Sequence, residues 1–229
     1  MLIFESLAFA RGAFQISADF SVEEGRKIAI LGPSGGGKST LLSLIAGFER
    51  PQSGRVLWQG QDQRALSPGQ RDCTIVFQEG NLFPHLSVYQ NVALGARPNL
   101  RLTRDDHTRV ETALASVGIE ETQKKPGQLS GGQRARVALA RAIVRKKRLL
   151  MLDEAFSALG PALKSEMFDL VDKAVAQLNA TLLIVTHDPE EAARMDAIIV
   201  VEGGQAAAPV SAKALLADPP PGLRAYLGK

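Results

Sequence analysis

The chain has 229 residues, of which 45% are hydrophobic and 22% are charged, and its formal net charge is +3. This length suits one large domain, or one domain with an inserted subdomain, and the composition is that of a globular protein rather than a disordered one. The charge is too mild and too evenly spread to favour nucleic-acid binding, and no apolar stretch approaches the length of a membrane span.

Apolar runs alternate with helical patterns along the chain. Five such runs stand out, namely residues 28–31, 74–77, 149–152, 182–185 and 198–201, and all of their residues are apolar except Thr74. Continuous rather than alternating apolar character is typical of strands covered on both faces of a parallel sheet. Helical patterns follow the first, third and fourth runs, so the sequence predicts an α/β fold. The single cysteine, Cys73, cannot form an internal disulfide, which favours a reducing cytosol.

Two regions depart from this alternation. Residues 1–25 and about 51–63 hold short alternating segments, which predict a small antiparallel sheet at one edge. Residues 79–135 are too many for a loop and place Val110, Leu114 and Val117 at helical spacing. We therefore expect a single domain over residues 1–229 with a helical subdomain inserted at about 79–135.

A glycine-rich stretch follows the first apolar run and precedes a helical pattern. It consists of Gly32, Pro33, Ser34, Gly35, Gly36, Gly37, Lys38, Ser39 and Thr40. This is the phosphate-binding P-loop pattern in its strand-to-helix context, which disfavours an incidental glycine-rich turn. Backbone N–H groups and the helix N-terminus would surround phosphate oxygens. Lys38 would reach the β- and γ-phosphates and Ser39 would ligate Mg²⁺, so the pattern predicts ATP and Mg²⁺ as bound species.

The third apolar run, 149–152, ends in two carboxylates, Asp153 and Glu154. The carboxyl edge of a parallel sheet is where α/β proteins bind ligands. Asp153 is predicted to hold Mg²⁺ and Glu154 to act as general base for the attacking water. The alternative is an acidic cap at a helix start, and the presence of a P-loop in the same chain favours the catalytic interpretation.

Two further motifs permit a functional and a structural interpretation. His187 follows the fourth run and could orient water at the γ-phosphate, although a lone histidine at a strand end is often structural. Ser130, Gly131, Gly132 and Gln133 precede a strong helix-forming segment. They predict a second anion-binding helix start, with an ordinary cap and turn as the alternative.

The chain resembles the ABC ATPases, and the resemblance covers essentially all of it. It rests on four motifs that follow one another in that family's order: the P-loop, the pentapeptide 129–133, the acidic strand end and His187. It implies a P-loop NTPase fold with a mixed central sheet, a small antiparallel β subdomain and an inserted helical subdomain. It also implies an ATP-dependent head-to-tail homodimer, in which ATP lies between the P-loop of one chain and Ser130 to Gln133 of the other. Gln78 matches the family's Q-loop glutamine, which contacts Mg²⁺ and the attacking water.

The resemblance further implies partners in a membrane. Residues 81–91, from Asn81 to Asn91, look like the surface on which a permease docks, with Phe83, Leu86 and Val88 as apolar anchors. A periplasmic binding protein would act indirectly through that permease. The implied location is peripheral, on the cytoplasmic face of a bacterial inner membrane.

Three positions depart from the family's pattern. Ala155 stands where proline usually follows the catalytic glutamate, and Gly160 stands where an aspartate is usual, so a contact with the opposite P-loop would be weaker. Arg11 stands where an adenine-stacking aromatic is expected, with Phe9 and Phe14 nearby. The planar guanidinium of Arg11 can cover a purine face, so we expect adenine to stack on it.

Within the family, the chain is most similar to the ATPase subunits of bacterial thiamine importers, in residues 30–34, 81–86 and 156–159. The same pieces occur in ATPases of iron(III), sulfate and polyamine importers, which remain alternatives. Soluble non-transport ABC ATPases usually need long coiled-coil insertions or tandem units, for which 229 residues leave no room. A P-loop kinase of small metabolites would have no use for the pentapeptide or His187.

Overall fold

The computed structural model describes residues 1–78 and 81–226 and divides into two compact units. The first unit combines Met1–Cys73 with Thr181–Lys229, and the second spans Thr74–Ala180.

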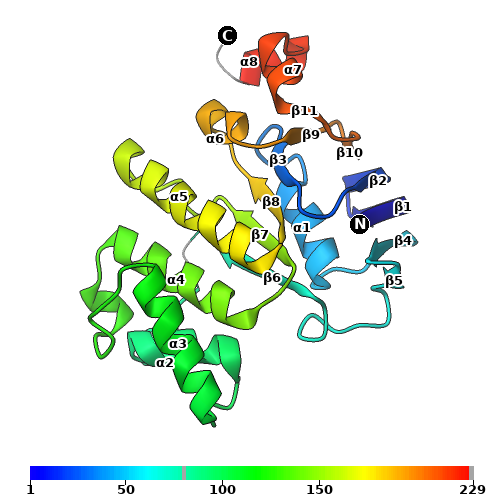
Figure 1. Ribbon diagram of the computed structural model, residues 1–229. Helices are drawn as coiled ribbons and strands as arrows, with labels where there is room; N and C mark the ends of the chain where they lie inside the picture. The colour runs from blue at the N-terminus through cyan, green and yellow to red at the C-terminus, as the bar shows by residue number, and fades with distance from the viewer. Residues whose placement is uncertain (79–80, 227–229) are drawn as a thin grey trace. The chain divides into compact units, whose positions relative to one another are not determined.

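Parallel strands form the core of the first unit. β3 (Lys27–Leu31) pairs with β8 (Thr181–Val185) on one side and with β9 (Ala197–Glu202) on the other, both in parallel. β8 is buried along its whole length, as continuous apolar character requires. Helix α1 (Lys38–Ala46) follows β3, and α6 (Pro189–Ala193) follows β8 (Figure 1). The predicted α/β fold is confirmed here by three buried parallel strands.

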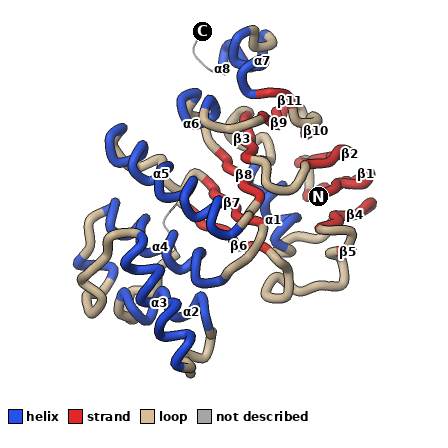
Figure 2. Tube along the Cα trace, viewed as in Figure 1, coloured by secondary structure: helices blue, strands red, loops and turns tan. Residues whose placement is uncertain are grey.

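The edge of the first unit is antiparallel, as the alternating segments predicted. β1 (Leu2–Arg11) pairs with β2 (Phe14–Val22) and with β4 (Ser53–Trp58), and β4 pairs with β5 (Gln61–Asp62). These strands lie together as red segments in Figure 2. β10 (Gln205–Ala206) joins them to the parallel strands, because it is parallel to β2 and antiparallel to β9. The sheet is therefore mixed.

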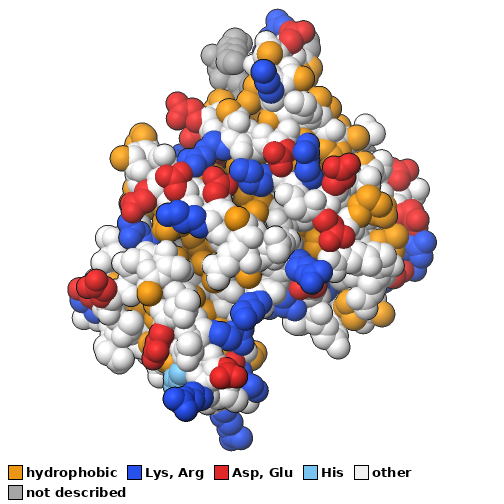
Figure 3. Space-filling model, in the orientation of Figure 1, with side chains coloured by type: hydrophobic (Ala, Val, Ile, Leu, Met, Phe, Trp, Pro, Cys, Tyr) orange, Lys and Arg blue, Asp and Glu red, His pale blue; other side chains and the backbone are white. Residues whose placement is uncertain are grey.

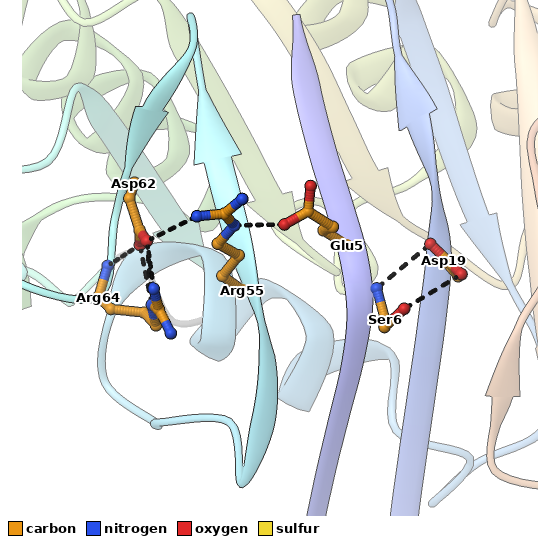
Figure 4. Close-up of polar contacts among 6 residues, drawn as sticks. All are labelled: Glu5, Ser6, Asp19, Arg55, Asp62 and Arg64. Carbon is orange, nitrogen blue, oxygen red and sulfur yellow. Dashed lines mark hydrogen bonds and ion pairs between the residues drawn. The ribbon is translucent and has the colours of Figure 1, made fainter.

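Charged side chains line this antiparallel edge (Figure 4). Arg55 of β4 forms ion pairs with Glu5 of β1 and Asp62 of β5, and Arg64 pairs with Asp62 at 2.7 Å. The hydrogen bond from Arg64 lowers the pKa of the Asp62 carboxyl. Exposed pairs of this kind contribute little to stability, but charge on an edge strand discourages pairing with another chain.

The remaining elements of the first unit follow β9. β11 (Val210–Ser211) pairs antiparallel with β9, and the short helices α7 (Ala212–Ala217) and α8 (Pro221–Tyr226) come next. Ala212, at the start of α7, is buried.

Two neighbouring strands and a long helix carry or flank the candidate catalytic residues of the second unit. β6 (Cys73–Phe77) lies beside β7 (Leu149–Asp153), and α5 (Pro161–Leu178) follows β7. Cys73, the first residue of β6, is buried. Both strands match the apolar runs predicted from the sequence.

Helices make up the rest of the second unit. α2 (Val88–Ala96), α3 (Arg104–Ser116) and α4 (Gly131–Arg145) pack on one another and lie together in the green part of Figure 1, and a short 3₁₀ helix, η1 (Pro126–Gln128), precedes α4. Val110, Leu114 and Val117 are at most 2% exposed, as their helical spacing predicted. α4 continues to Arg145, past the expected subdomain limit near 135, because its residues from 137 to 144 are apolar apart from Arg141 and most of them are buried.

The distribution of charge on the surface and the character of the helices agree with the sequence analysis, which found mild, evenly spread charge and no membrane span. Basic and acidic side chains are intermixed on the face drawn in Figure 3. In the part of the chain that the structure describes, no helix has both the length and the apolar character needed to cross a bilayer.

Candidate functional site

The P-loop of the first unit joins β3 to α1 and holds its lysine inside the loop. Lys38 is only 7% exposed, and its Nζ donates hydrogen bonds to the carbonyl oxygens of Gly32 at 2.8 Å and Pro33 at 2.9 Å. Gly37 caps α1 with a φ of 107°, and a Cβ there would lie 2.9 Å from the Phe14 ring. The backbone of this loop is thus packed closely enough to require glycine.

The start of α1 is arranged to attract an anion. The first turn contains no acidic residue that would oppose the positive end of the helix dipole. Pro33, Ser34, Gly35 and Ser39 are exposed. A phosphate group at this point would meet backbone N–H groups, a hydroxyl and the Lys38 ammonium.

His187 lies at the same edge of the parallel strands of the first unit as the P-loop. Val185 of β8 lies opposite Ile30 of β3, so the residues that follow the two strands emerge side by side. Thr186 is buried and accepts a hydrogen bond from the Asp188 backbone N–H at 3.0 Å. These contacts fix the turn, and the His187 side chain is exposed on it.

Glu154, in the second unit, has a strained backbone. Its φ is 49°, a left-handed conformation that costs a residue with a Cβ about 1–2 kcal/mol. Its carbonyl oxygen accepts hydrogen bonds from the Ser157 N–H at 3.2 Å and hydroxyl at 3.0 Å, which hold the turn. The alternative of a helix-start cap is wrong, because α5 begins at Pro161 and its N-cap is Gly160.

The pentapeptide forms the start of α4. Ser130 is the N-cap, and its Oγ accepts a hydrogen bond from the Gln133 N–H at 3.2 Å. The Gln133 side-chain oxygen accepts in return from the Ser130 N–H at 2.9 Å. Gly132 is buried, and a Cβ there would lie 2.5 Å from Leu163 of α5. The motif is therefore a capping box, whose helix N-terminus remains a site of positive partial charge.

A cavity of about 580 Å³ brings three motifs of the second unit together. Gln78 from the end of β6, Gly131 from the pentapeptide and Ala155 next to Glu154 all line it. The other lining residues are Val76, Arg134, Ala135, Ala138, Ala158 and Leu159. The alanine at 155, one of the departures noted in the sequence, thus lies on a wall built largely of small side chains.

The segment predicted to receive a permease has a different exposure from the one expected. Phe83 is 45% exposed and packs edge to face on His85, with ring centroids 6.0 Å apart. Val88 is fully buried as the first residue of α2, so its prediction as an interface anchor is wrong. Leu86 is half-buried. The exposed apolar contact surface of this segment therefore centres on Phe83.

Asn91 shapes this segment from within, a role that the sequence analysis missed. It is fully buried, and its side chain donates to the carbonyl oxygens of Phe83, Leu86 and Ser87 at 3.0–3.2 Å and accepts from the Phe83 N–H at 2.7 Å. The sequence feature that could have revealed this role is the position of Asn91 next to Val92, in a helical pattern whose apolar residues Val88 and Val92 are four positions apart. A buried amide needs several partners, and here the segment supplies them.

The position predicted to stack on adenine lies at the end of β1. Arg11 is exposed, forms an ion pair with Glu49, and places its guanidinium carbon 5.5 Å from the centre of the Phe9 ring. Phe14, by contrast, lies against Gly37 of the P-loop.

Gly160 has no steric reason to be glycine. Its φ of −69° suits any residue, and a Cβ there would meet nothing within 4 Å. Nothing in the structure explains the missing aspartate.

The residues predicted to hold Mg²⁺ have suitable donor chemistry. Ser39 offers a hydroxyl, Asp153 a carboxylate and Gln78 an amide oxygen, and Mg²⁺ prefers oxygen ligands. Ser39 and Gln78 are exposed, and Asp153 is half-buried at the end of β7.

The chain is similar in sequence to known ABC transporter proteins. Residues 17–157 match a family described as "ABC transporter". The chain is 52% identical to the thiamine import ATP-binding protein ThiQ of Cereibacter sphaeroides, with 100% of both chains covered. It is 49% identical to the protein of the same name from Ruegeria sp., again over both full lengths. It is 48% identical to that of Brucella suis, over 96% of this chain and 93% of the relative.

Solved structures show the same similarity. A dimeric, post-hydrolysis structure of the ATP-binding cassette MJ0796 with ADP and Pi superimposes with a TM-score of 0.79 and 28% identity, covering 93% of this chain and 99% of that one. CbiO1 from Clostridium perfringens, part of an ABC transporter complex, gives a TM-score of 0.83 and 33% identity over 95% of this chain and 90% of that one.

Proposed function

Since the chain belongs to the ABC transporter family of ATP-binding proteins, we propose that it is the ATP-hydrolysing subunit of a thiamine importer. The observation that carries this proposal is that relatives matching the chain from end to end are thiamine import ATP-binding proteins. The P-loop at the start of α1 supports the motor function, because it is a phosphate-binding structure. Hydrolysis of ATP would supply the energy for uptake.

Each catalytic residue has a separate task in this proposal. Lys38 binds the β- and γ-phosphates and stabilises charge on the transferring group. Glu154 accepts a proton from the attacking water, and Gln78 and His187 orient that water. The hydrogen-bonded turns at Glu154 and His187 support these roles, because they fix the backbone from which each side chain extends.

Mg²⁺ is proposed to bind with ATP, held by Ser39, Asp153 and Gln78. Their oxygen donors support this assignment. When bound, the ion neutralises charge on the phosphates.

We also propose that ATP binding pairs two copies of the chain head to tail. Ser130, Gly131, Gly132 and Gln133 of one copy would then bind the ATP held by the P-loop of the other. The N-terminus of α4 supports this, since it presents a positive partial charge. The similar cassette MJ0796 is described as dimeric with ADP and Pi.

The partners of the dimer are proposed to be integral-membrane permease subunits, which a periplasmic binding protein supplies with cargo. The permease would dock on the segment from Asn81 to Asn91, where Phe83 is the exposed apolar anchor. This arrangement would place the chain peripherally on the cytoplasmic face of a bacterial inner membrane.

Deletion of the gene in a strain that cannot make thiamine should sharply raise the external thiamine that growth requires. Uptake of labelled thiamine and its phosphate esters measures the effect directly, and the intact gene supplied on a plasmid should restore it. Normal thiamine uptake with impaired iron(III), sulfate or polyamine uptake would assign the chain to another importer. That outcome would leave the ATPase function intact.

Replacing Arg11 by Ala should lower the apparent affinity for ATP several-fold, because stacking of a purine on a planar cation contributes about 0.5–2 kcal/mol. Titration with a fluorescent ATP analogue measures the affinity. Phe14→Ala is the comparison variant, since Phe14 lies beside the P-loop. Unchanged affinity in R11A together with a loss in F14A would move the stacking surface to Phe14.

A further inference from the structure

Arg71 is a buried cation whose position no catalytic role explains. It lies in the loop after β5, in the first unit, and is 5% exposed. Its Nη1 donates hydrogen bonds to the carbonyl oxygens of Leu44 at 2.8 Å and Ile45 at 2.6 Å. Both carbonyls belong to the last turn of α1, the helix that begins at the P-loop (Figure 1).

These contacts complete the C-terminus of α1. The last carbonyl groups of a helix have no partner within it and must find one elsewhere. The Ser43 carbonyl accepts from the N–H groups of Gly47 and Phe48, both at 2.9 Å. The Leu44 and Ile45 carbonyls accept from Arg71 instead. The last turn of α1 contains no basic residue of its own, so this end of the helix receives its cation from a different segment.

Gly47 leaves room for this guanidinium. It ends α1 in a left-handed conformation with φ 85°, and a Cβ there would lie 2.5 Å from Nε, 2.6 Å from Cζ and 2.8 Å from Nη2 of Arg71. Any other residue would displace Arg71 or strain the turn.

In the part of the chain that the structure describes, no carboxylate contacts Arg71 to balance its charge, although the charge of Asp62 raises its pKa from a distance. Within residues 1–78 and 81–226, Arg71 forms no ion pair with an acidic side chain. Burial lowers the pKa of its guanidinium, the direction expected when a cation is withdrawn from water. The negative partial charge at the C-terminus of α1 is the compensating group in contact with it.

We propose that Arg71 is a positioning residue for the nucleotide, which fixes α1 from its C-terminus and strengthens phosphate binding at its N-terminus. This inference rests on the proposed binding of ATP at the P-loop. α1 has nine residues and is therefore only about 13 Å long. The negative end of so short a helix opposes a phosphate at the other end, and the full positive charge of Arg71 outweighs that opposition. The gain in nucleotide affinity that Arg71 provides should therefore grow with the number of negative charges on the nucleotide.

The test compares nucleotides of different charge. Affinities for ATP, ADP and AMP are measured by competition against a fluorescent ATP analogue, in the wild-type chain, R71M and R71K. We expect R71M to weaken ATP binding about tenfold, ADP binding less and AMP binding least. R71K keeps the charge and should recover most of the ATP affinity. In steady state, the KM for ATP should rise in R71M more than kcat falls.

Arg64→Met is the matched control. Arg64 lies in the same loop but is exposed and paired with Asp62 (Figure 4), so its loss should change each affinity by less than about twofold. Melting curves establish that each variant is folded. If R71M does not fold, R71Q, whose amide can still donate to a helix carbonyl, undergoes the same comparison.

An equal loss of affinity for ATP, ADP and AMP would overturn the inference, because it would make Arg71 a purely structural residue. Unchanged affinities in folded R71M, or in R71Q where it is the variant measured, would overturn it as well. If the wild-type chain binds no nucleotide, the proposed function itself fails, and that result is distinct from both.

Discussion

Replacing Lys38 by Ala is expected to reduce Mg²⁺-dependent ATP hydrolysis about 10³-fold. The ammonium is buried in the P-loop, with donors directed at the Gly32 and Pro33 carbonyls. In the active protein the same charge would stabilise the transferring phosphoryl group. Removal of a charge-assisted contact to the transferring group costs several kcal/mol of transition-state stabilisation.

The measurement is phosphate release by the purified chain at saturating ATP. Lys173→Ala is a matched control, because Lys173 is an exposed lysine on α5 and its loss should leave turnover unchanged. Melting curves must show that Lys38→Ala is folded, since the loop carbonyls lose a donor in it. Turnover close to that of the wild type in the folded variant would refute the assignment of the P-loop.

Glu154→Gln should still bind ATP but hydrolyse it about 10²- to 10⁴-fold more slowly, the range that a general base contributes. Glutamine keeps the shape and length of the side chain and removes only the basic oxygen. The left-handed backbone at this position disfavours Glu and Gln alike, so the turn should survive the change. Because ATP is not consumed, the ATP-bound dimer should accumulate.

Size-exclusion chromatography with light scattering detects this dimer in the presence and absence of ATP. Glu120→Gln, an exposed substitution of the same kind, should behave as the wild type. A monomer that ignores ATP and still turns over would contradict both the role of Glu154 and the head-to-tail dimer.

The fold could be predicted wherever the burial of a segment determines which positions along the sequence are apolar. The runs at 28–31 and 182–185 are apolar at every position because both faces of these strands are covered, and β3 and β8 follow them closely. The P-loop was predictable because phosphate binding needs glycines, a lysine and a hydroxyl at fixed spacing between a strand and a helix.

Other features were not predictable because they depend on how helices face one another. Val88 was predicted to be an exposed anchor, but it is fully buried as the first residue of α2. Asn91 was predicted to end the docking surface, but it is buried among carbonyl groups of its own segment. The rotation of a helix about its axis is set by its neighbours, and the apolar spacing of a nine-residue helix constrains it weakly.

The sequence by itself therefore determined the α/β fold and the glycine-rich loop between a strand and a helix, since these follow from local periodicity and spacing. The residues assigned to hydrolysis stay predictions. The tertiary structure alone decided the left-handed conformation of Glu154, the enclosure of Asn91 and the contact of Arg71 with the end of α1. Arg71 is 27 and 26 residues from its partners Leu44 and Ile45. A contact between such distant residues leaves no pattern in one sequence, because chain folding brings the groups together and spacing does not record it.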